Sequence, residues 1–213
     1  MISKLKGNGR AIAFLLAKPF VACRAQPLAV SLLALPPALA FAFFIVRQNF
    51  LVAFPFGFLA VLVDLFDGEV ARRQGKDSLF GNYLEGIIDK AVDFILIGGF
   101  VFLFPVPTVL ALGCSFLASF AKPRAGLVII TDNRDWPGIG ERGDKLALLL
   151  LGTLLAAFFP VVLGAETIPA TLFLVAAVSF IGLFQRVFYA KKLIGEAESR
   201  GTVLPYLKKA KRS

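Results

Sequence analysis

The feature that most constrains this chain is a series of long apolar runs separated by short polar segments. An α-helix needs about 20 predominantly apolar residues to cross the hydrocarbon core of a bilayer. Hydropathy and helix-breaking residues place six such runs at 29–46, 49–67, 86–105, 107–130, 144–164 and 168–190. We therefore expect an all-α membrane protein with six transmembrane helices.

The composition agrees with this expectation, because 58% of the residues are hydrophobic, which is more than a soluble domain usually carries. Residues 1–28 mix basic and apolar side chains, which predicts an amphipathic helix lying on the membrane surface. Residues 29–195 would then form the six-span membrane domain, and residues 196–213 a basic cytoplasmic tail.

The basic residues predict the orientation of the chain. Apart from Arg47, every Lys and Arg lies in or beside segments that six spans place on the same side as both termini. The positive-inside rule assigns that side to the cytoplasm. The net charge of +9 requires no nucleic acid, because juxtamembrane Lys and Arg contact anionic lipid head groups. We expect a multi-pass membrane protein with membrane lipids, and no nucleic acid, as partners.

Carboxylates interrupt the apolar pattern in the segment DLFDGEVARRQGKDSLFGNYLEGIID, residues 64–89. Asp64 and Asp67 share one helix face, and Glu85 and Asp89, four residues apart, share another. Several like charges at a membrane edge are unfavourable unless cations lie between them. Because the chain has no histidine, oxygen ligands would favour Mg²⁺, Mn²⁺ or Ca²⁺. Four carboxylates on two helices could hold two ions, an arrangement suited to phosphoryl chemistry.

Small residues and a cation accompany these carboxylates. Gly68 and Ala71 share the face of Asp64, and Gly81 shares the face of Glu85, so space remains beside the acids. Arg72 adds a permanent cation, a natural partner for phosphate. Together these residues indicate a diphosphate site at the cytoplasmic edge. The alternative is that the glycines only permit close helix packing and the charges only cap helix ends.

The same segment resembles a known signature, that of the CDP-alcohol phosphotransferase family. The pattern is Asp-x-x-Asp-Gly-x-x-Ala-Arg, eight residues, then Gly-x-x-x-acid-x-x-x-Asp. It is carried here by Asp64, Asp67, Gly68, Ala71, Arg72, Gly81, Glu85 and Asp89. The family usually has Asp where this chain has Glu85, whose longer side chain could shift a bound ion or alter the acceptor pocket.

The resemblance implies a dimeric membrane enzyme of phospholipid biosynthesis. Such an enzyme transfers a substituted phosphate from a CDP-linked donor to an alcohol acceptor and releases CMP. By matching positions, Asp64, Asp67 and Glu85 would hold Mg²⁺ or Mn²⁺, and Asp89 would complete the metal site and act as the base. The residues implied for the nucleotide are Gly68, Ala71, Arg72 and Gly81, with Ser78 as a weaker candidate.

Four further cations could hold an acceptor that carries a phosphate, such as glycerol phosphate or inositol phosphate. They are Arg124, Arg142, Lys145 and Arg186, near the predicted cytoplasmic helix ends. Arg142 and Lys145 are three residues apart and so share a helix face. Each could also be an ordinary positive-inside anchor. One Trp and three Tyr argue weakly against an aromatic cage for choline, so we favour a CDP-diacylglycerol donor over CDP-choline or CDP-ethanolamine.

Two other classes of protein stay open. Membrane prenyltransferases also use Asp-rich motifs with Mg²⁺, although they typically carry two such motifs far apart in a longer chain. Ion-coupled transporters also contain intramembrane acids, and Asp93 suits that alternative. Asp93 could equally pair with Lys90 or with a neighbouring helix.

Overall fold

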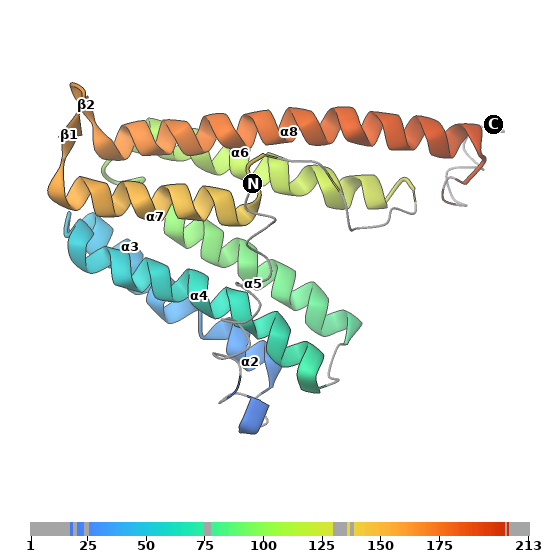
Figure 1. Ribbon diagram of the computed structural model, residues 1–213, viewed down its shortest axis with the longest axis horizontal. Coiled ribbons are helices and arrows are strands. Elements are labelled where there is room, and N and C mark those ends of the chain that lie inside the picture. Colours follow the sequence, from blue (N-terminus) through green and yellow to red (C-terminus); the bar gives the residue numbers. More distant parts are fainter. Residues whose placement is uncertain are drawn as a thin grey trace. The chain divides into compact units, whose positions relative to one another are not determined.

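The computed structural model is built almost entirely from helices (Figure 1). It describes residues 18, 21–23, 26–74, 78–129, 136, 139–202 and 204, without the side chains of 27, 64–69 and 71–74. The elements are α2 (Pro27–Leu32), α3 (Leu35–Val46), α4 (Phe50–Gln74), α5 (Leu79–Gly98), α6 (Pro105–Gly126), α7 (Arg142–Phe158), β1 (Val161–Val162), β2 (Ala165–Glu166) and α8 (Thr167–Ser199). Most of the predicted amphipathic segment, 1–28, and most of the predicted tail, 196–213, lie outside the described residues.

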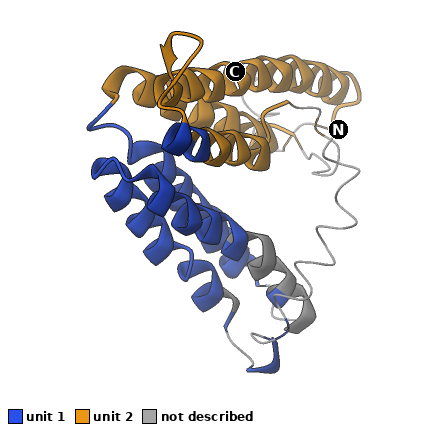
Figure 2. Cartoon of the chain, turned by 60° about the vertical axis from the view of Figure 1, so that its left-hand side comes forward, with its two compact units in different colours: residues 1–103, 153–158 blue, residues 104–152, 159–213 orange. Residues whose placement is uncertain are grey.

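The chain divides into two compact units (Figure 2). Unit 1 comprises residues 1–103 and 153–158, and unit 2 comprises residues 104–152 and 159–213. In unit 1, α3 packs against both α4 and α5, and α2 contacts the same two helices. The ring of Phe41 on α3 meets the ring of Phe100 edge to face, with centroids 5.9 Å apart. Both side chains are fully buried, so this aromatic pair forms the centre of the unit 1 core.

The first predicted span, 29–46, is interrupted in the structure. Helix α2 ends at Leu32, and α3 begins at Leu35, with proline in its first turn. Pro36 and Pro37 lack the N–H groups that would bond to the preceding turn, so a helix restarts there more readily than it continues. The two helices nevertheless form one apolar stretch, Leu28–Val46.

In unit 2, α6 and α8 pack along each other. Residues 142–152 of α7 belong to the same unit. They approach α8 closely at Gly152, where an added Cβ atom would overlap the side chain of Thr171. Glycine therefore permits a close approach of the two helices that any larger residue would prevent.

The expectation that 144–164 is a single helix is wrong at its end. Helix α7 stops at Phe158, and Val161–Val162 pairs antiparallel with Ala165–Glu166. The turn between the strands contains Leu163 at φ 53° and Gly164 at φ 79°. Glycine adopts that conformation readily, and Pro160 cannot continue the helical hydrogen bonds. The fold class is thus helical, with one two-stranded hairpin in the described part of the chain.

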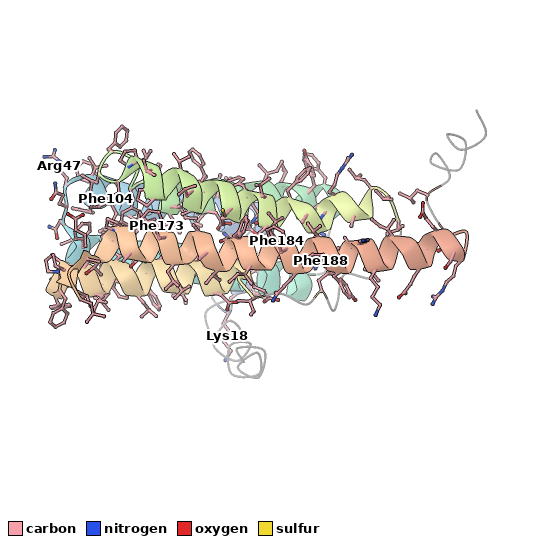
Figure 3. The ribbon with its side chains drawn as sticks, turned by 90° about the horizontal axis from the view of Figure 1, so that it is seen from above. Lys18, Arg47, Phe104, Phe173, Phe184 and Phe188 are labelled. Atoms are coloured by element: carbon pink, nitrogen blue, oxygen red, sulfur yellow. The ribbon has the colours of Figure 1, made fainter. Side chains whose placement is uncertain are left out.

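Many large apolar side chains lie on the surface. Phe173, Phe184 and Phe188 project from α8 (Figure 3) and are 48%, 47% and 65% exposed. Among the described residues, three stretches are long and apolar enough to cross a membrane: Leu28–Val46, Pro105–Gly126 and Thr167–Ser199. Exposed phenylalanines on such stretches are suited to contact with lipid chains.

Candidate active site

The motif residues lie on two helices of unit 1 that contact each other. Helix α4 runs without interruption to Gln74, beyond the predicted end of the second span at residue 67, so it carries the whole Asp64–Arg72 part of the motif. Helix α5 carries Gly81, Glu85 and Asp89. The helices α4 and α5 contact each other, and both contact α3. The side chains of Asp64, Asp67, Gly68, Ala71 and Arg72 lie outside the described residues, whereas their backbones are helical.

Ser78 and Gly81 form the beginning of α5. Ser78 is the N-cap residue, and its Oγ atom accepts a hydrogen bond of 2.9 Å from the backbone N–H of Gly81. A Cβ atom at Gly81 would lie 2.8 Å from that Oγ atom. The glycine therefore leaves room for the capping hydroxyl, which satisfies one of the free N–H groups of the first turn.

Glu85 and Asp89 follow on the same helix, four residues apart, and both are half-buried. Four residues make about one helical turn, so the two carboxylates project from the same face of α5. Carboxylate oxygens are the ligands that Mg²⁺ and Mn²⁺ prefer. Among the side chains that the structure describes, no three acidic, cysteine or histidine residues cluster as a metal site. Glu85 and Asp89 are the two predicted metal ligands whose side chains the structure describes. Their carboxylate oxygens and their spacing are nevertheless those that a hard divalent cation needs.

Asp93, one turn further along α5, has a partner. Its Oδ2 atom lies 3.0 Å from the Nζ atom of Lys90, and its side chain is buried. The alternative in which Asp93 pairs with Lys90 is confirmed. This buried carboxylate therefore needs no transported cation to compensate its charge.

Two of the four predicted acceptor cations are held by α6, within unit 2. The Nζ atom of Lys145, on α7, lies 2.7 Å from Ser115 Oγ. The Nη1 atom of Arg186, on α8, donates a hydrogen bond of 2.5 Å to the backbone oxygen of Ala118. Because Ser115 and Ala118 are three residues apart, they share a face of α6. The structure thus brings Lys145 and Arg186, which are 41 positions apart in the sequence, to adjacent points of one helix.

The other two cations lie at helix ends. Arg142 is half-buried and is the first residue of α7, one turn before Lys145. Arg124 is exposed in the last turn of α6. Lys145, by contrast, is only 2% exposed. Arg142 and Arg186 are therefore the members of the set that combine partial burial with partial access to solvent.

Sequence analysis did not single out two polar residues of unit 2. Ser115 accepts the hydrogen bond of Lys145, and Gln185 accepts one from the backbone N–H of Ile139. The signal that could have identified them is a polar side chain inside an apolar run, which needs a partner when it is buried. Hydropathy alone cannot name that partner.

A family model for CDP-alcohol phosphatidyltransferases matches residues 24–185. The chain is 34% identical, over 139 residues, to archaetidylinositol phosphate synthase of Pyrococcus horikoshii, covering 63% of this chain and 66% of that protein. The chain thus spans just under two thirds of the length of this curated relative.

The fold is also similar to that of phosphatidylinositol phosphate synthase from Mycobacterium tuberculosis. The crystal structure of that protein with CDP-DAG bound has a TM-score of 0.69 and 23% identity, covering 84% of this chain and 94% of the other. The structure of the same protein in complex with manganese and citrate has a TM-score of 0.68 and 24% identity, covering 84% and 88%. The family match extends over most of the described helices and includes the entire motif, and the apolar helices agree with insertion in a membrane. This chain is a helical membrane protein that belongs to the CDP-alcohol phosphatidyltransferase family.

Proposed function

We propose that this chain transfers a substituted phosphate from CDP-diacylglycerol to an alcohol that itself carries a phosphate, and releases CMP. The observation that carries the proposal is the placement of the whole family signature on the contacting helices α4 and α5, with Glu85 and Asp89 one turn apart. The complex of the similar M. tuberculosis protein with CDP-DAG supports this donor. The product would be a phospholipid, so the reaction belongs to phospholipid biosynthesis.

In this proposal, Asp64, Asp67, Glu85 and Asp89 hold two divalent ions, Mg²⁺ or Mn²⁺. The manganese complex of the M. tuberculosis protein supports a metal requirement. When bound, such ions neutralise the negative charge of the diphosphate. Gly68, Ala71 and Gly81 leave room for the nucleotide, with Ser78 beside them, and Arg72 contacts a phosphate.

The proton transfer is assigned to Asp89. A carboxylate oxygen of Asp89 accepts the proton of the acceptor hydroxyl. The hydroxyl oxygen then forms a bond to the phosphorus that carries the diacylglycerol group. The bond from that phosphorus to the bridging oxygen breaks, and the bridging oxygen leaves with its electron pair as part of CMP. One P–O bond is formed and one is broken, so the step requires no oxidant or reductant.

The acceptor is proposed to bind through the cations of unit 2. Arg142 and Arg186 combine partial burial with access. Lys145, on α7, and Arg186, on α8, bond to neighbouring residues of α6, and Arg124 lies at the end of α6. A guanidinium presents several N–H groups in the geometry that phosphate oxygens accept. The names of the relatives, which refer to inositol phosphate lipids, support inositol phosphate as the acceptor.

The proposed enzyme crosses the membrane six times, with α2 and α3 forming one span. Both termini and the active site face the cytoplasm, as the distribution of Lys and Arg favours. An amphipathic segment, 1–28, precedes the membrane domain, 29–195, and a basic tail, 196–213, follows it. Two copies associate as a homodimer.

The proposal is tested by measuring CMP release from the purified protein in detergent with Mn²⁺ or Mg²⁺. CDP-diacylglycerol is supplied with inositol phosphate, glycerol 3-phosphate, inositol or serine. CDP-choline and CDP-ethanolamine with diacylglycerol are assayed in parallel. We expect metal-dependent CMP release with inositol phosphate, and a rate of release about 10²- to 10⁴-fold lower in Asp89→Asn. Release with inositol or serine alone would contradict the phosphate-bearing acceptor, and no release from any pair would contradict the reaction.

A further inference from the structure

The turn that precedes α7 lies directly against α8, backbone to backbone. Gly140 has φ 76°, and a Cβ atom there would lie 2.8 Å from the backbone oxygen of Val178. A Cβ atom at Gly182 would overlap the backbone oxygen of Ile139. Only glycine at both positions allows this approach, because glycine has no Cβ atom, and at Gly140 it also adopts positive φ without strain. The contact fixes residues 139–141 on one face of α8.

A side chain of α8 adds a specific hydrogen bond to this contact. The Oε1 atom of Gln185 accepts from the backbone N–H of Ile139 at 2.8 Å, across 46 residues of sequence. One turn further along α8, Tyr189 packs edge to face against Trp136, with ring centroids 5.3 Å apart. Gly182, Gln185 and Tyr189 therefore form one continuous line along α8 that holds the segment leading into α7.

Two of the cations assigned to the acceptor directly follow residues of this contact in the sequence. Gln185 is the sequence neighbour of Arg186, and the turn that it holds continues into Arg142. On α8, Arg186 donates its hydrogen bond to the backbone oxygen of Ala118. The position of the turn thus determines where Arg142, the first residue of α7, lies with respect to α8, the helix that carries Arg186.

We infer that Gln185 is a positioning residue for the acceptor phosphate: its amide oxygen holds Ile139, and thereby fixes the start of α7, with Arg142, on the helix that carries Arg186. The inference rests on the proposed function, because it assumes that Arg142 and Arg186 bind that phosphate. Gln185 itself needs no contact with the substrate. Its loss would weaken binding of the phosphate-bearing acceptor and leave binding of the nucleotide donor unchanged.

The experiment compares three variants of the full-length protein in detergent. Gln185→Met keeps the length of the side chain and removes the amide oxygen, whereas Gln185→Glu keeps an oxygen that can accept the Ile139 N–H. Gln26→Met is the matched control, because Gln26 is exposed and its side chain makes no capping hydrogen bond. The readouts are KM for inositol phosphate, KM for CDP-diacylglycerol, kcat, and hydrogen exchange of the peptide that contains Ile139.

We expect Gln185→Met to raise KM for inositol phosphate about 5- to 10-fold, the loss that one weakened hydrogen-bonded contact produces. KM for CDP-diacylglycerol should stay within about twofold, because Gln185 holds no residue that is assigned to the donor. Exchange at Ile139 should accelerate, and Gln185→Glu should recover most of the acceptor affinity and the protection. Gln26→Met should match the wild-type protein.

Three results would overturn the inference. The first is faster exchange at Ile139 with an unchanged KM for inositol phosphate. The second is an equal rise of both KM values, which would indicate general loosening. The third is unchanged exchange at Ile139 in Gln185→Met. If the wild-type protein releases no CMP with any acceptor, the proposed function fails, and the inference about the acceptor fails with it, whereas the exchange measurement still reports whether Gln185 holds the turn.

Discussion

The Nζ atom of Lys145 lies 2.7 Å from the Oγ atom of Ser115, and both side chains are buried between α6 and α7. A buried ammonium group loses its hydration, so each hydrogen bond that replaces water matters for stability. The backbone oxygen of Ser115 lies 3.5 Å from the same Nζ atom. A single residue of α6 thus supplies two oxygen atoms to this cation.

Replacing Ser115 by alanine should destabilise the protein by about 1–3 kcal/mol, the effect of leaving a buried donor poorly satisfied. The measurement is the midpoint of thermal unfolding in detergent. Ser199→Ala is the control, because Ser199 is exposed and bonds only to the preceding turn of its own helix among the bonds described. An unfolding midpoint of Ser115→Ala equal to that of Ser199→Ala would contradict the role of this bond.

Replacing Asp89 by asparagine should lower kcat for CMP release by about 10²- to 10⁴-fold, since the amide cannot accept the proton of the acceptor hydroxyl. Asp93→Asn provides the matched control one turn further along α5, because Asp93 pairs with Lys90 and belongs to no proposed ligand set. The control should keep most of the activity, with some loss of stability. Equal inactivation by both substitutions would show that the effect is structural.

Glu85 can be tested with one shorter and one neutral side chain. Glu85→Asp restores the residue that the family usually has, so it should retain activity with a changed Mn²⁺ concentration for half-activation. Glu85→Gln removes the charge and should weaken metal activation by 10-fold or more, about 1.4 kcal/mol. Titration of activity with Mn²⁺ distinguishes the two variants. Identical titration curves for Glu85→Gln and the wild-type protein would exclude Glu85 as a ligand.

The Ser78–Gly81 contact predicts that the effect of Gly81→Ala on stability depends on whether the Ser78 hydroxyl is present. In the wild-type protein, the added methyl group of Gly81→Ala meets the Ser78 hydroxyl, displaces the cap and offsets the better helix propensity of alanine. In a Ser78→Ala background there is no hydroxyl to displace, so Gly81→Ala should stabilise the protein by up to about 1 kcal/mol. Unfolding midpoints of the four proteins measure the coupling, and additive effects would refute it.

Two glycines of unit 2 should respond in opposite directions to alanine. Gly152→Ala places a methyl group into Thr171 and should destabilise the protein by about 1–3 kcal/mol. Gly113, exposed on α6, has open space around it, and Gly113→Ala should be neutral or stabilising by up to about 1 kcal/mol. Thermal unfolding in detergent compares the two variants directly. Destabilisation by Gly113→Ala as large as that by Gly152→Ala would contradict the packing described.

Much of the helical pattern could be predicted from the sequence because long apolar runs admit few structures in a membrane. Hydropathy ends the second span at residue 67, because it falls at the Asp64–Asp67 pair. Only the helical spacing of the motif, which places Gly68 and Ala71 on the face of Asp64, indicates that the helix continues, as α4 does to Gln74. The hairpin after Phe158 was missed for a related reason. Val161 and Val162 are as apolar in a strand as in a helix, and only Pro160 and Gly164 distinguish the two cases.

For the site, the acidic motif could be recognised because its residues lie close together in the sequence. The contacts of Lys145 with Ser115 and of Arg186 with Ala118 could not, because they join separate helices and depend on packing. Ser78 illustrates a further limit. The resemblance implies a nucleotide contact for Ser78, which stays a prediction, and it gives no sign that the Ser78 hydroxyl caps the first turn of α5.

The length of α8 makes its end a suitable attachment site for probes and fusion partners. Its 33 residues extend about 50 Å at 1.5 Å per residue, whereas the hydrocarbon core is about 30 Å thick. Even with some tilt, at least one end of this continuous helix must extend beyond the hydrocarbon core. A fluorophore attached near Ser199 would therefore report the inclination of the helix within the bilayer, and a rigid fusion there would give electron microscopy a particle large enough to align.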